Sequence, residues 1–123
     1  MIVAVSLPSG ASRVSSHGYD PFLKFPWSKQ LKAGWSIGGI ESLFWNTDSG
    51  KRNGLWEPTF YIDKEITKPW DAFAEYAGDF AQRNGPKEIA HLGTAYRFTR
   101  RQQFDFHFGF DLTQAAPRCF FAV

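Results

Sequence analysis

Phe104-Asp-Phe-His-Phe-Gly-Phe-Asp111 is the stretch of this sequence that decides the fold. Every second residue is phenylalanine, and the residues between them are charged, polar or small. Successive side chains of a β-strand point to opposite faces of the sheet, whereas a helix would spread both sets around its circumference. The segment therefore predicts a strand with one face of phenylalanines and one polar face.

Three segments upstream alternate in the same way, over residues 56–66, 70–80 and 91–98. Each has roughly the ten residues of a tilted strand that crosses a membrane. Lys64 falls on the apolar parity and Phe73 on the polar one. Lys64 is close to a strand end, where its long side chain could extend to a polar boundary.

The whole chain, residues 1–123, is predicted to be a single all-β domain, an antiparallel up-and-down meander of about eight strands. The predicted connections alternate between short and long, with one long loop at 46–54, as in outer-membrane barrels. A change of parity around Gly38 and Gly39 predicts a β-bulge. The expected strands are 2–8, 20–27, 33–45, 55–66, 70–81, 88–98, 103–111 and 118–123.

The five tryptophans all fall at the ends of predicted strands. Indole rings prefer the membrane–water interface, and a soluble core would place some of them at mid-strand. We therefore expect a wall of a transmembrane β-barrel in the bacterial outer membrane, with the lipid bilayer as partner. The expected interface aromatics are Trp27, Trp35, Trp45, Trp56 and Trp70.

Composition argues against several other classes of protein. Lys and Arg number 14 against 12 Asp and Glu, a net charge of +2 that is too balanced to indicate a nucleic-acid partner. Cys119 is the single cysteine, which excludes an intrachain disulfide and a cysteine-based metal site. No segment approaches the ~20 apolar residues of a membrane-spanning helix.

The polar parity carries charged residues that are expected to line the lumen of the barrel. They could form an acidic pore lining that selects cations or polar solutes, or a network of ion pairs that fills and stiffens the barrel. The alternation leaves both readings open. The expected lumen residues are Glu57, Asp63, Glu65, Glu75, Asp79, His91, Arg97, Asp105, His107 and Asp111.

The sequence contains no catalytic motif. Repeated carboxylates on one face follow from the alternation alone, and neither Gly-x-Ser-x-Gly nor a phosphate-binding glycine loop is present. His91 and His107 fall on the polar faces of adjacent predicted strands, so a metal site with a third ligand from an Asp is conceivable. Hydrogen bonding in the lumen explains them more simply. We expect no enzyme activity, no cofactor and no metal.

Several segments together resemble the outer-membrane β-barrel proteins of the phenol-degradation meta-pathway family. They are Trp-Ser-Lys at 27–29, Lys-Ala-Gly-Trp at 32–35, Phe-Ala-Glu-Tyr at 73–76 and the closing segment 103–110 with Ala-Ala-Pro at 115–117. The resemblance implies a channel or transporter for small, hydrophobic or aromatic compounds. Family members are longer, so it also implies that the chain is a C-terminal fragment, truncated at both ends.

The alternating phenylalanines alone fit a second architecture. In a soluble, lipocalin-like β-barrel the same side chains would point inward around an apolar ligand. The positions of the tryptophans, the loop lengths and the family resemblance favour the membrane barrel over this alternative.

Overall fold

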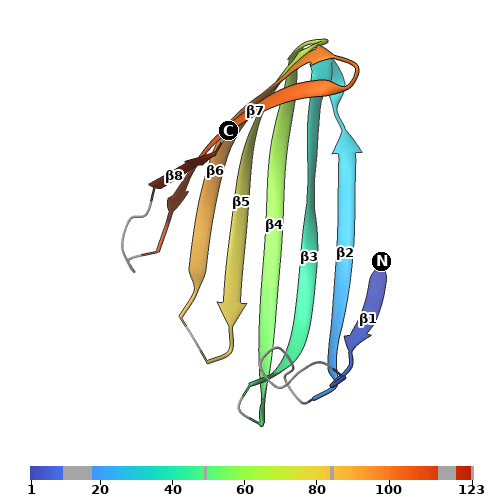
Figure 1. Cartoon of the computed structure of the whole chain (residues 1–123), viewed down its shortest axis with the longest axis vertical. Helices are drawn as coiled ribbons and strands as arrows, with labels where there is room; N and C mark the ends of the chain where they lie inside the picture. Colours follow the sequence, from blue (N-terminus) through green and yellow to red (C-terminus); the bar gives the residue numbers. More distant parts are fainter. Residues whose placement is uncertain (10–17, 49, 84, 114–118, 123) are drawn as a thin grey trace.

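The computed structural model describes residues 1–9, 18–48, 50–83, 85–113 and 119–122. They form one antiparallel sheet of eight strands in which each strand pairs with the next along the chain (Figure 1). A 3₁₀ turn, η1, links β2 to β3. The predicted all-β antiparallel meander is confirmed. The elements are β1 Ile2–Ser6, β2 Asp20–Gln30, η1 Lys32–Gly34, β3 Trp35–Asp48, β4 Lys51–Thr67, β5 Trp70–Ala81, β6 Lys87–Thr99, β7 Gln102–Asp111 and β8 Cys119–Ala122.

The predicted long loop at 46–54 is wrong. β3 and β4 remain paired as far as Asp48 and Lys51, and Gly50 adopts the positive φ of 75° that a tight hairpin requires. The backbone ladder needs no apolar side chains, so polar residues extend the hairpin beyond its apolar part. The long–short alternation of connections therefore fails at this position.

The predicted bulge at Gly38 and Gly39 is also wrong. β3 keeps a continuous register with β2 and β4 through both glycines. The parity changes because Ile40 points to the polar face and Glu41 to the apolar face. The register shifts instead between Glu65 and Thr67 and between Arg97 and Thr99, close to the short turns.

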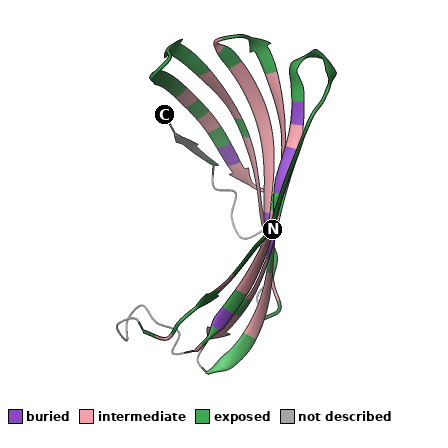
Figure 2. Ribbon diagram, turned by 90° about the vertical axis from the view of Figure 1, so that its right-hand side faces the viewer, coloured by how far each residue is buried: buried purple, intermediate pink, exposed green. Residues whose placement is uncertain are grey.

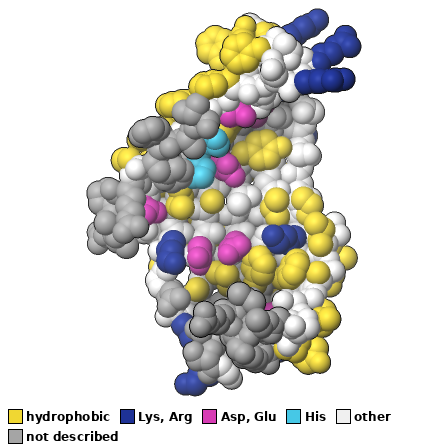
Figure 3. Space-filling model, in the orientation of Figure 1, with side chains coloured by type: hydrophobic (Ala, Val, Ile, Leu, Met, Phe, Trp, Pro, Cys, Tyr) yellow, Lys and Arg dark blue, Asp and Glu magenta, His cyan; other side chains and the backbone are white. Residues whose placement is uncertain are grey.

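The register defines two faces of the sheet, because residues paired directly across strands point to the same side. Figure 2 shows that the sheet is curved, and Figure 3 looks onto the polar face, which lies on the inside of the curve. Among the polar residues that are buried in the described part of the chain, Ser36 and Ser42 point to this face. No hydrophobic side chain in the described ranges is buried, so the apolar face is uncovered.

Candidate functional site

The apolar face is a continuous aromatic and aliphatic surface. Its exposed large side chains range from 39% exposed at Phe108 to 64% exposed at Phe98. Apolar patches of this extent on a protein mark contact with another apolar phase, either a partner or a membrane. Its most exposed members include Phe25, Phe60, Ile66, Leu92, Tyr96, Phe98, Phe104, Phe106 and Phe108.

All five tryptophans point to the apolar face, in two rows. Trp27, Trp35 and Trp70 lie toward the end of the sheet with the short turns, and Trp45 and Trp56 lie toward the opposite end. The prediction that all five stand at strand ends is wrong in part. Trp35 and Trp70 begin β3 and β5, but the other three lie inside strands that continue past the aromatic rows.

The distance between the two tryptophan rows, measured along the axis of a barrel, can be calculated from β3. Trp35 and Trp45 are ten residues apart on this strand and share the apolar face. At about 3.3 Å per residue they are about 33 Å apart along the strand, which a tilt of about 40° reduces to about 25 Å of height. An apolar band of about 25 Å between two aromatic girdles is typical of transmembrane β-barrels.

Charged residues interrupt the apolar face between or beside these rows, and Lys64, Glu41 and Glu88 are among them. The Lys64 ammonium donates a hydrogen bond to the Ala33 carbonyl oxygen and lies 5.3 Å from the centre of the Trp35 ring. Its side chain therefore extends to the short-turn end, as predicted. Glu41, which the parity argument missed, accepts a hydrogen bond of 2.9 Å from Trp56 Nε1.

The ten residues predicted to line a lumen all point to the polar face, where acidic and histidine side chains gather (Figure 3). The structure brings only some of them together. His91 Nδ1 lies 3.7 Å from Glu75 Oε2 on the neighbouring strand. Glu57 is opposite Ser42, and Asp79 is opposite Lys87.

A chain of polar contacts crosses β5, β6 and β7 near the short turns. Arg97 Nη2 lies 3.1 Å from Asp71 Oδ2, and Arg97 Nε donates to Gln103 Oε1 at 3.3 Å. Gln103 Nε2 in turn donates to Asp105 Oδ1 at 2.6 Å. Asp71 and Gln103 were missing from the predicted set, although both share the polar parity of their strands. This part of the polar face is thus an ion-pair network.

Next to this network the polar face is hollowed. Asp63 Oδ1 accepts a hydrogen bond of 3.4 Å from Ser36 Oγ at the edge of the hollow. Two aromatic rings and two carboxylates therefore face one space. The hollow has a volume of about 340 Å³ and is lined by Ser36, Tyr61, Asp63, Phe73 and Glu75.

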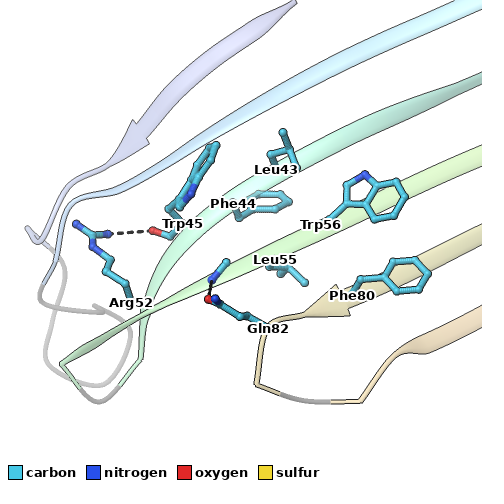
Figure 4. A pocket seen from close by; sticks show the side chains of 9 residues that line it. Leu43, Phe44, Trp45, Arg52, Leu55, Trp56, Phe80 and Gln82 are labelled. Carbon is cyan, nitrogen blue, oxygen red and sulfur yellow. Dashed lines mark hydrogen bonds between the residues drawn. The ribbon is translucent and has the colours of Figure 1, made fainter.

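A second, slightly larger hollow of about 390 Å³ lies mainly on the apolar face, around Trp45 and Trp56 (Figure 4). Arg52 Nη1 donates to the Trp45 carbonyl oxygen at 3.0 Å, and the Gly54 amide donates to Gln82 Oε1 at 3.4 Å. These bonds fix the backbone around the hollow. This second hollow opens on the apolar face and is therefore separate from the hollow on the polar face.

The chain matches a known protein family over its whole length. Residues 1–123 fit the model of the family described as "Putative MetA-pathway of phenol degradation". The chain belongs to this family. The family resemblance inferred from the sequence is thereby confirmed, and no curated protein and no solved structure matches the chain.

In this member of the phenol-degradation family, the described residues contain no group of three or more His, Cys, Asp or Glu side chains arranged to hold an ion. His107 stands edge-on to the Phe73 ring, with 6.0 Å between ring centres.

No helix in the described ranges has the length and apolar character needed to cross a membrane.

Proposed function

We propose that this chain forms part of the wall of a transmembrane β-barrel in the bacterial outer membrane, serving as a channel or transporter for small compounds. The observation that carries the proposal is the spacing of Trp35 and Trp45, which matches the apolar band of such barrels. The apolar face would contact lipid, and the polar face would line the pathway. In lipid, the edge strands β1 and β8 would both have to be paired, because unpaired backbone groups are costly there.

The curvature of the sheet supports the membrane barrel over a soluble one. A lipocalin-like barrel would place its apolar side chains on the inside of the curve, around the ligand. Here the inside carries the carboxylates and histidines, and the exposed phenylalanines and tryptophans are on the outside (Figures 2 and 3). The alternative of a soluble binding protein would require the opposite curvature.

The polar-face hollow supports a small, hydroxylated aromatic compound as solute. The rings of Tyr61 and Phe73 could pack against an aromatic ring, and Asp63 or Glu75 could accept a hydrogen bond from its hydroxyl group. The family description names phenol degradation, which fits this chemistry. We propose that passage depends on the width and charge of the lining, without catalysis or a cofactor.

The test is fractionation of cells that produce the full-length protein, combined with gel mobility before and after heating. We expect recovery in the washed outer-membrane fraction and a heat-dependent shift in mobility, followed by phenol flux into vesicles that contain the protein. Recovery in the soluble fraction would contradict the proposal. An empty-vesicle control separates flux through the protein from diffusion of phenol across the bilayer.

A further inference from the structure

Positive charge gathers at the end of the sheet with the short turns. The segments around the short turns, 28–34, 67–69 and 99–102, contain five basic residues and no acidic residue. All five are exposed, and Lys and Arg side chains project at the top of Figure 3, where these turns lie. We call this group the basic rim; its members are Lys29, Lys32, Lys68, Arg100 and Arg101.

The basic rim adjoins the row of tryptophans on the apolar face. Trp35 follows η1 directly, and Trp70 comes two residues after Lys68. The Lys64 ammonium, 5.3 Å from the Trp35 ring centre, shows that positive charge and indole occupy the same level of the sheet. Interfacial tryptophans of membrane proteins sit at the level of the lipid headgroups.

We propose that the basic rim binds the phosphate groups of anionic phospholipids in the leaflet around the short turns. The proposal rests on the function proposed above, because it needs the apolar face to be in the bilayer. Ammonium and guanidinium groups form strong, charge-assisted hydrogen bonds to phosphate. One basic residue close to an anionic lipid surface raises binding about fivefold, and five of them act together here.

The test uses the full-length protein in phosphatidylcholine vesicles that contain either brominated phosphatidylglycerol or brominated phosphatidylcholine. Bromine quenches tryptophan fluorescence at short range, so the quenching reports which lipid is next to the indoles. We expect the relative binding constant to favour phosphatidylglycerol by about fivefold or more, and to fall as sodium chloride is added.

The variant K29Q/K32Q/K68Q/R100Q/R101Q should lose this preference. A matched control, K51Q/R83Q, removes two exposed basic residues from the opposite end and should retain it. If the variant with five substitutions does not fold, the salt dependence of lipid preference in the unaltered protein tests the proposal instead. A preference that sodium chloride leaves unchanged would overturn the proposal.

Other outcomes separate this proposal from the proposed function. A protein that inserts, shows heat-dependent mobility and is quenched equally by both lipids would refute lipid binding by the basic rim and leave the barrel intact. A protein that inserts into no vesicle would refute both. Loss of the preference in inorganic phosphate, with chloride of equal ionic strength having no such effect, would show that the rim binds free phosphate rather than lipid.

Discussion

The ring of Phe73 lies across Gly93, its direct partner on the neighbouring strand, and occupies the space that a β-carbon would take. Tyr61 covers Gly38 in the same way, with its ring atoms 2.7 Å from the position of a β-carbon there. Both pairs are on the polar face. A ring laid over glycine covers backbone that would otherwise be open, a device that stabilises glycine in β-sheets. This packing explains how a phenylalanine, Phe73, is accommodated on the polar face of the sheet.

Replacing Gly93 with alanine should destabilise the protein, because the new methyl group would displace the Phe73 ring. The expected loss in the free energy of unfolding is about 1–3 kcal/mol, measured by urea unfolding of the full-length protein in vesicles. Gly54→Ala is the matched control, since its β-carbon would meet only Gln82, at 3.7 Å. Equal effects of the two substitutions would contradict the packing seen at Phe73.

Replacing Lys64 with glutamine should lower the free energy of unfolding by about 1 kcal/mol, through loss of the interactions with Trp35 and the Ala33 carbonyl oxygen. The same vesicle unfolding experiment measures it. Lys51→Gln, at the other end of the sheet, is expected to change stability by less than about 0.5 kcal/mol. If Lys64→Gln leaves the free energy of unfolding unchanged, the ammonium contributes nothing to anchoring this turn.

If the apolar face contacts lipid as proposed, replacing Glu41 with leucine should stabilise the protein in a bilayer by about 1 kcal/mol. The gain from removing an unfavourable carboxylate then exceeds the loss of its hydrogen bond from Trp56 Nε1. The measurement is the unfolding free energy in vesicles. Glu57→Leu provides the comparison, because Glu57 is on the polar face and its replacement removes a group from a wet surface. A stability gain at Glu57 but not at Glu41 would reverse the assignment of the two faces.

Removing charge from the polar-face hollow should weaken cation selectivity. For D63N/E75Q we expect the permeability ratio of potassium to chloride, from reversal potentials in planar bilayers, to fall by about twofold or more. Glu41→Gln removes one negative charge from the other face and should leave the ratio unchanged. An unchanged ratio in D63N/E75Q would place the hollow outside the conducting path.

Much of the architecture could be predicted from the sequence because alternation directly encodes the two faces of a strand. The segment 104–111 gave its strand and its orientation correctly, and so did the parity of the ten polar-face residues. The hairpin around Gly50 was missed because backbone pairing continues through polar residues that carry no apolar pattern. Glu41 was missed because its bond to Trp56 comes from an adjacent strand and leaves no local signal.

The contacts of the site were less predictable than its residues. Parity placed Glu75 and His91 on one face, but their proximity depends on the register between β5 and β6. The same holds for the contact of Arg97 with Asp71. Register is set by the hydrophobic pattern together with the geometry of the turns, and alternation alone predicts neither the turn at Gly50 nor the register shifts near the short turns.

The described part of the sheet buries no hydrophobic side chain, and this has a consequence for how the protein is made. A water-soluble domain acquires its stability by collapsing onto itself, but the residues that the structure describes form a single layer with no second one onto which the sheet can collapse. If the bilayer supplies that layer, the surrounding lipid does the work of a hydrophobic core, and folding and insertion become a single step. Before insertion, the chain would then have to reach the membrane unfolded. Its phenylalanines would have to be shielded on the way so that the chain does not aggregate.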